Sequence, residues 1–217
     1  MINWHDIESV FLDMDGTLLD LHFDNHFWRE FVPRRYAQRH DLDLDAAKAN
    51  LFPRFNAVEG TLDWYCVDYW SNELDLDIPL LKQELHHLIS VHPHVVEFLD
   101  ALRRRGKRVV LVTNAHQKSL QLKMECTQLA GYFSALICAH EFGIPKEKSD
   151  FWSRLQKREP FDRQQTLLVD DSVPVLKAAR DYGIRHLLAV RRPDTQSPPR
   201  EISEFPAIDS FLDILPV

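Results

Sequence analysis

Five short apolar runs, with helical patterns between them, constrain the fold of this chain more than any other feature. They are residues 10–12, 108–113, 135–139, 166–169 and 186–190. Runs this short and this continuously apolar are typical of parallel strands that are covered on both faces. Helical periodicity fills residues 95–102, 119–129 and 173–182, and a glycine follows each pattern. This alternation predicts an α/β protein with a doubly wound parallel sheet.

The segment between the first two strands breaks the alternation. It is rich in aromatic and charged residues, and we expect helices at 24–39, 44–58, 64–74 and 79–88. We therefore predict an inserted all-helical cap domain at residues 20–90, and an α/β core domain made of residues 1–19 and 91–217. Prolines after Arg191 indicate an irregular segment, and residues 208–214 are expected to form a short closing helix.

Composition excludes several classes of function. The chain has 217 residues, 45% of them apolar, and a net charge of −7. A negative chain has no general attraction to nucleic acid or to anionic membranes, so neither is an expected partner. The first apolar run is too short for a signal peptide or a membrane span. Three cysteines without a CxxC spacing predict reduced thiols. We expect a cytoplasmic protein, and both a monomer and a dimer stay open.

Polar and charged side chains stand where the predicted strands end. Because ligands of open parallel sheets bind outside the carboxyl ends of the strands, these side chains are expected to meet at one edge. The candidates are Asp13, Asp15, Thr113, Asn114, Lys146, Asp170 and Asp171.

This combination of side chains suits phosphoryl transfer. Clustered carboxylates repel one another unless a cation lies between them, and Mg²⁺ prefers oxygen ligands. The loop 13–17 can present backbone N–H groups to an anion, and Lys146 can neutralise phosphate oxygens. Taken alone, Asp-x-Asp-Gly is also compatible with a simple turn, and Asp170-Asp171 with a helix N-cap. The joint pattern, with each part at a strand end, favours a catalytic site.

The same motifs resemble those of the haloacid dehalogenase superfamily. Residues 13–18 (Asp-Met-Asp-Gly-Thr-Leu) are similar to its first motif and residues 112–114 to its second. Pro145-Lys146 resembles the third, and residues 168–172 the fourth. The resemblance covers residues 10–190.

The resemblance implies a role for each matched residue. Asp13 would attack phosphorus and form an aspartyl-phosphate, and Asp15 would act as general acid and then as general base. The rest of the catalytic set would be Thr113, its neighbour Asn114 in the second motif, and Lys146. Of these, Thr113 and Lys146 would hold phosphoryl oxygens. Asp13, the carbonyl of Asp15 and Asp171 would bind Mg²⁺. Asp170 would be a further metal ligand or would orient Lys146. An acidic residue that many relatives carry after the fourth motif is not visible at 173–177.

Asp15 narrows the reaction. Dehalogenases that resemble this core lack an acid at that place, whereas a leaving alkoxide needs a proton. Hydrolysis of a phosphoric monoester is therefore expected. A phosphomutase would keep both aspartates, so it stays an alternative. A non-catalytic binding module with a decayed site is the alternative of a different class.

Two aromatic-rich segments, residues 20–28 and 61–70, point to the substrate. They resemble the enterobacterial GMP/IMP nucleotidases within this superfamily, which implies a purine 5′-nucleotide as substrate. Aromatic faces can stack on a purine base. The candidate substrate-binding residues are Asn25, Trp28, Trp64 and Tyr65. Such aromatic residues also pack helices together, and sugar phosphates or other small phosphorylated metabolites stay open as substrates.

Overall fold

The computed structural model describes residues 2–216 and contains one parallel sheet of six strands in the order β3-β2-β1-β4-β5-β6. The strands are β1 (Ser9–Leu12), β2 (Arg108–Thr113), β3 (Ala135–Cys138), β4 (Thr166–Asp170), β5 (His186–Val190) and β6 (Ala207–Ile208). Every neighbouring pair is parallel. The predicted fold class, a doubly wound parallel sheet, is confirmed.

The register of the sheet determines which strand ends meet. Leu12 of β1 lies opposite Leu111 on one side and Val169 on the other. The next residue, Asp13, continues this pairing, because its N–H donates to the carbonyl of Val169 at 3.0 Å. The end of β1 therefore lies between the ends of β2 and β4, which carry the other predicted site residues.

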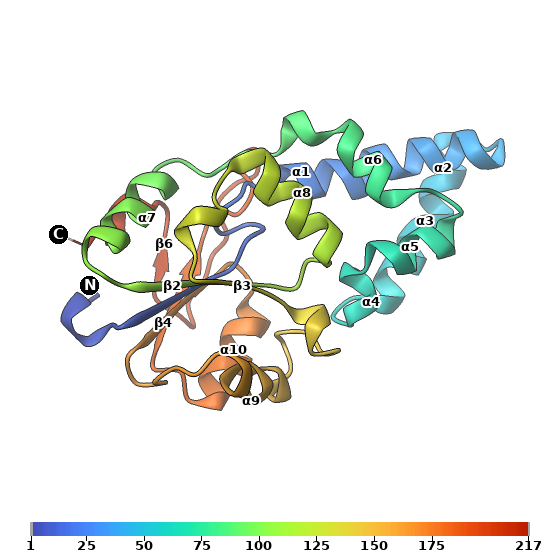
Figure 1. Ribbon diagram of the computed structural model, residues 1–217. Helices are drawn as coiled ribbons and strands as arrows, with labels where there is room; N and C mark the ends of the chain where they lie inside the picture. Colours follow the sequence, from blue (N-terminus) through green and yellow to red (C-terminus); the bar gives the residue numbers. More distant parts are fainter. Residues whose placement is uncertain (1, 217) are drawn as a thin grey trace.

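Helices cover both faces of the sheet, as Figure 1 shows with α7 and α8 on one side and α9 and α10 on the other. They are α7 (Val95–Arg104), α8 (Gln117–Thr127), α9 (Ser149–Arg158) and α10 (Val173–Tyr182). Two separate apolar clusters lie between these layers and the sheet, one on each face. This double cover explains why the strands are apolar without alternation.

One helix of the core was absent from the sequence prediction. In α9 the residues Phe151, Trp152 and Leu155 are fully buried, while the rest of the helix is charged or polar. Three apolar residues at spacings of one and three are a weak periodic signal, and only packing against the sheet makes them a core face.

The helical insertion, residues 20–90, extends from one end of the sheet (Figure 1). It contains α1 (His22–His26), a π-helical turn (Phe27–Phe31), α2 (Val32–His40), α3 (Leu44–Val58), α4 (Leu62–Tyr65), α5 (Val67–Leu74), α6 (Ile78–Glu84) and a 3₁₀ turn (His86–Leu88). Its apolar cluster draws all its buried members from residues 27–81, separate from the two clusters of the sheet. The division into a core domain and a cap domain stays a prediction, and the separate apolar cluster of the insertion is consistent with it.

The predicted helix 64–74 is broken at Cys66. That residue has extended backbone angles, and its thiol accepts a hydrogen bond from the Tyr69 N–H at 3.4 Å, so it caps the start of α5. Cysteine is a rare N-cap, so the residue type did not signal the break. The predicted helix 79–88 likewise ends early, at Glu84.

The closing segment also differs from the prediction. Ile208, expected to start a helix, instead pairs with Val190 as part of the edge strand β6, and only Phe211–Ile214 forms a 3₁₀ turn. The unpaired edge of β5 offers hydrogen bonds that a two-residue strand can take, and no local pattern announces this.

The predicted reduced cysteines agree with the structure, in which Cys66, Cys126 and Cys138 form no disulfide. Within residues 2–216, no helix combines the length and apolar character needed to cross a membrane.

Candidate active site

A cavity of about 480 Å³ lies at the carboxyl ends of the central strands. All the predicted core residues line it: Asp13, Asp15, Thr113, Asn114, Lys146, Asp170 and Asp171. The convergence expected from the parallel sheet is therefore present in the structure.

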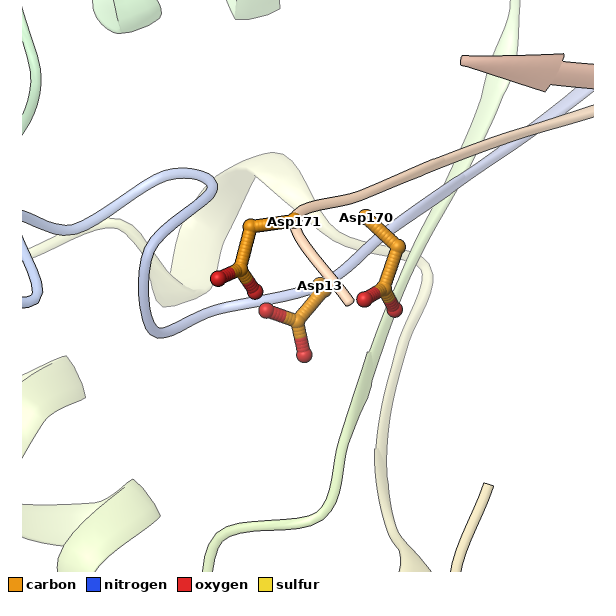
Figure 2. Close-up of side chains that lie close together, drawn as sticks. All are labelled: Asp13, Asp170 and Asp171. Atoms are coloured by element: carbon orange, nitrogen blue, oxygen red, sulfur yellow. The ribbon is translucent and has the colours of Figure 1, made fainter. Parts of the chain in front are cut away.

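Three carboxylates form the centre of this cavity. Asp13, Asp170 and Asp171 each place a carboxylate oxygen within 4.8 Å of the others (Figure 2). Burial raises the pKa of Asp13 to about 7, and the neighbouring Asp170 adds to the shift against the effect of Lys146. Burial together with Asp13 raises the pKa of Asp171 to about 7 as well. Three neighbouring carboxyl groups resist ionisation because their negative charges repel one another. A hard divalent cation such as Mg²⁺, which prefers oxygen ligands, would relieve this repulsion.

Lys146 is buried beside this centre. Its ammonium group donates to Asp13 Oδ1 at 2.5 Å, to Asp170 Oδ2 at 2.7 Å and to the carbonyl of Val112 at 3.0 Å. Burial disfavours the charged lysine, but Asp13 and Asp170 together outweigh this, so the pKa of Lys146 lies above its usual value. The lysine therefore stays charged and holds the Asp13 carboxylate in place.

Asp170 has both carboxylate oxygens engaged. Oδ2 accepts from Lys146, and Oδ1 accepts from the N–H of Ser172 at 2.9 Å. Of the two roles that the sequence left open, this arrangement favours the orientation of Lys146, with Asp171 as the freer carboxylate for a cation. Asp171 has one partner side chain, Arg200, whose guanidinium donates to Oδ2 at 3.1 Å.

Thr113 and Asn114 differ in what they offer a substrate. The Thr113 hydroxyl accepts from the N–H of Ala115 at 3.0 Å, which leaves its proton free to donate. Both ends of the Asn114 side chain have a partner, because its oxygen accepts from the Lys146 N–H at 2.9 Å and its amide donates to Glu147 Oε2 at 2.9 Å. Asn114 therefore positions the loop that carries Lys146.

Gly16 allows the first loop to approach the carboxylates. It has a φ of +84°, and a Cβ atom at this position would lie 2.8 Å from the Cγ and Oδ2 atoms of Asp171. Both the left-handed backbone and the contact exclude a side chain here. The glycine of the first motif thus allows the turn and also leaves room for the Asp171 carboxylate.

A second cavity, of about 660 Å³, adjoins the first and lies against the helical insertion. The four predicted substrate-binding residues, Asn25, Trp28, Trp64 and Tyr65, all line it. Asp15 and Tyr65 line both cavities. Tyr65 donates to Glu147 Oε1 at 2.6 Å, so the aromatic cavity is connected to the loop of Lys146.

The aromatic residues of this cavity also pack against one another. The ring centroid of Trp28 lies 5.6 Å from that of Phe55 and 5.8 Å from that of Trp70. The packing role that the sequence left open is therefore present, and it coexists with exposure to the cavity.

Several charged residues of the site gave no signal in the sequence. Lys123, Asp24 and Lys82 form an ion network with Asp15 and line the second cavity. Burial raises the pKa of Asp15, and Lys123 opposes this without cancelling it. Arg200 was missed in the same way, because it reaches the site from a loop without a motif of its own. Glu147 was missed although it directly follows the third motif, Pro145-Lys146.

Comparisons with known proteins agree with this geometry. The family of haloacid dehalogenase-like hydrolases matches residues 7–183. The chain is 36% identical to the GMP/IMP nucleotidase YrfG of Escherichia coli (strain K12), over 99% of this chain and 97% of that protein. It is 27% identical to the phosphoglycolate phosphatase of Nitrosospira multiformis, over 82% of this chain and 80% of that protein.

Solved structures share the fold. The HAD phosphatase from Thermococcus onnurineus superposes with a TM-score of 0.80 at 19% identity, and 96% of each chain is covered. The predicted enzyme class, a hydrolase of phosphoric monoesters, is confirmed by the family match and the nucleotidase relative. The chain belongs to the haloacid dehalogenase-like hydrolases.

Proposed function

We propose that this chain is a magnesium-dependent purine 5′-nucleotidase that acts through an aspartyl-phosphate on Asp13. The observation that carries the proposal is the pair of adjoining cavities. One is lined by carboxylates and a lysine, the other by tryptophan and tyrosine side chains, and Asp15 lies at their junction. A phosphate group would occupy the first cavity and a nucleoside the second. At about 660 Å³ the aromatic cavity is within the range of small-molecule sites.

In the first step, a carboxylate oxygen of Asp13 attacks phosphorus and the bond to the 5′ oxygen breaks. Asp15 gives its proton to that oxygen, so the nucleoside leaves as an alcohol. The raised pKa of Asp15, caused mainly by burial, favours the protonated form that this step needs. Lys146 and the free proton of the Thr113 hydroxyl would hold phosphoryl oxygens.

In the second step, water attacks the phosphorus of the aspartyl-phosphate. Asp15, now ionised, takes a proton from the water, the bond to Asp13 breaks, and phosphate is released. Asp13 returns as a carboxylate beside Lys146, ready for the next cycle.

The residues that would hold Mg²⁺ are Asp13, Asp171 and the carbonyl of Asp15, with Asp170 oriented toward Lys146. When bound, the cation would neutralise part of the negative charge of the phosphate and the carboxylates. The fit rests on Asp13 and Asp171, which each have a carboxylate oxygen within 4.8 Å of the other and of Asp170.

Asn25 supports a preference for 6-oxo purines. Its amide nitrogen donates to Asp194 Oδ2 at 2.7 Å, so the carboxylate determines which end of the amide is left for a ligand. The remaining atom is an oxygen, an acceptor, and it makes no hydrogen bond within residues 2–216. Guanine and hypoxanthine carry an N1–H donor, whereas adenine presents an acceptor at N1. The nucleotidase named above, which acts on GMP and IMP, agrees with this preference.

The test is kcat/KM for GMP, IMP, AMP, CMP and a sugar phosphate, with wild type, Trp64→Ala and Asp194→Asn. We expect GMP and IMP to exceed AMP by about tenfold or more, because an unpaired buried group costs about 1–3 kcal/mol. Trp64→Ala should weaken every purine, and Asp194→Asn should reduce the preference for the 6-oxo group.

The outcomes separate the parts of the proposal. Equal or faster turnover of the sugar phosphate would reject the nucleotide and favour a phosphatase or phosphomutase of small metabolites. A preference for GMP that Trp64→Ala leaves unchanged would keep the substrate and reject the role of that residue.

A further inference from the structure

A chain of four charged side chains links the Asp15 carboxylate to the helical insertion. Lys123 of α8 donates to Asp15 Oδ1 and to Asp24 Oδ2, each at 2.6 Å. The second oxygen of Asp24, in α1, accepts from Lys82 of α6 at 2.7 Å. The network therefore joins the catalytic loop to three helices, two of which belong to the insertion.

Aromatic rings fix the two lysines. The ammonium group of Lys82 lies 5.0 Å from the ring centroid of Phe23, 4.8 Å from that of Phe27 and 5.8 Å from that of Trp28. The ammonium group of Lys123 lies 5.2 Å from that of Phe23. Both lysine side chains are at most 5% exposed.

The network leaves half of the Asp15 carboxyl group free. Oδ1 is held by Lys123, and Oδ2 makes no hydrogen bond within residues 2–216. Asp15 lines both cavities, so this oxygen is available where the phosphate and the leaving group would join. A general acid needs such an arrangement, because proton transfer requires one correctly directed oxygen.

Stability alone is a poor reason for this network. Replacing a buried ion network with apolar residues of similar size is often neutral or stabilising, since the desolvation of four charges offsets their attraction. Apolar side chains would hold α1, α6 and α8 together equally well.

We infer that Lys123 is a positioning residue for the Asp15 carboxyl group, and that Asp24 and Lys82 fix Lys123 from the helical insertion. The inference rests on the proposed role of Asp15 as general acid and base. It extends the site to residues that no motif marks, and it connects the position of the insertion to the proton transfer.

The experiment compares substrates that differ in their need for a proton. p-Nitrophenyl phosphate releases a stable phenolate, whereas GMP releases an alkoxide that must be protonated. For Lys123→Met we expect kcat/KM to fall about tenfold or more further with GMP than with the aryl ester. Hydrolysis of the aspartyl-phosphate also needs Asp15, so stopped-flow traces of the aryl ester should show a burst of nitrophenolate.

Two further variants serve as references. Asp15→Asn should show the same dependence on the leaving group, more strongly, by about 10²-fold. Lys118→Met is the matched control, because Lys118 lies on the same helix and pairs with Asp68 of the insertion at 2.7 Å, but it is exposed and lines neither of the two cavities. It should keep both activities within about twofold of wild type.

The outcomes are distinct. If Asp15→Asn shows no dependence on the leaving group, the proposed role of Asp15 fails. If Asp15→Asn shows it and folded Lys123→Met does not, this inference alone is overturned. Should Lys123→Met not fold, Lys123→Met/Asp24→Asn removes one charge of each sign. That double variant must fold, and it must still lose more kcat/KM with GMP than with the aryl ester. If it does not do both, the network has only a structural role and the inference is overturned.

Discussion

Asp13 and Gly16 show how single residues carry the chemistry of this site. Asp13 is held by Lys146 at 2.5 Å and faces two further carboxylates, so its charge and direction depend on its neighbours. Gly16 contributes no functional group, yet it determines how closely the loop approaches Asp171. One residue supplies reactivity and the other supplies space.

Asp13→Asn should reduce turnover about a thousandfold or more, because an amide is a poor nucleophile and a weaker ligand for a cation. The melting temperature without metal should not fall, since one of three mutually repelling carboxylates is removed. Phosphate release and thermal melting measure the two effects. Asp181→Asn, at a largely exposed position, is the control. Activity above about a thousandth of wild type would reject Asp13 as nucleophile.

Gly16→Ala should raise the Mg²⁺ concentration needed for half-maximal activity by about tenfold, because the added Cβ displaces Asp171. Gly106→Ala is a matched control, with a φ of +63° but no atom within 4 Å of the added Cβ. Both variants should lose about 1–2 kcal/mol of stability from the left-handed backbone, and Gly16→Ala should lose more because of its contact with Asp171. Equal Mg²⁺ dependence in the two variants would contradict the role assigned to the contact with Asp171.

At the scale of elements, the loop after β5 fastens both ends of the helical insertion to the core. The Pro193 carbonyl accepts from the Leu21 N–H at 2.8 Å and lies 3.1 Å from His92 Nε2. Thr195 donates from its N–H to Asp20 Oδ1 at 3.1 Å, and its hydroxyl also donates to Asp20. Leu21 lies at the start of the insertion and His92 directly after its end, so this loop determines how the insertion meets the sheet.

Asp20→Ala should lower the free energy of unfolding by about 2–4 kcal/mol, because several donors around a nearly buried carboxylate lose their acceptor. Urea denaturation measures the change. Asp77→Ala, which removes the exposed N-cap of α6, should cost only about 1 kcal/mol. If Asp20→Ala costs no more than Asp77→Ala, the loop does not fasten the insertion.

At the scale of the whole molecule, the carboxylate centre makes folding depend on pH and on a cation. The folded pKa values of Asp13 and Asp171 are about 7 and that of Asp170 about 6, all raised mainly by burial from an ordinary 3.8. At pH values between 3.8 and about 7, the folded chain therefore binds more protons than the unfolded chain. Without metal, these groups therefore lower stability as the pH rises from about 4 to 7.

Mg²⁺ should accordingly raise the melting temperature more at about pH 8 than at about pH 5.5, because only the ionised carboxylates bind it well. Melting curves in EDTA and in Mg²⁺ at the two pH values provide the measurement. Asp171→Asn should reduce the difference between them. An equal shift at both pH values would mean that the cation does not bind at this centre.

Most of the core site was predictable from the sequence because parallel strands end at one edge. Asp13, Asp15, Thr113, Asn114, Asp170 and Asp171 follow directly from the positions of strand ends, and the loop motif adds Lys146. Local periodicity likewise determined the strands and most helices, since apolar runs record burial on both faces of a sheet.

Tertiary packing alone decided the parts of the site that join distant segments. Lys123 and Asp15 are 108 positions apart, and Asn25 and Asp194 are 169 apart. No periodicity or local spacing encodes such a contact, because it depends on how α8 and the loop after β5 pack against the insertion. The edge strand β6 has the same origin, because it forms only by pairing with β5. A side chain at the end of a strand is directed by its own strand, whereas a long lysine on a helix acquires its partner from whatever packs against that helix.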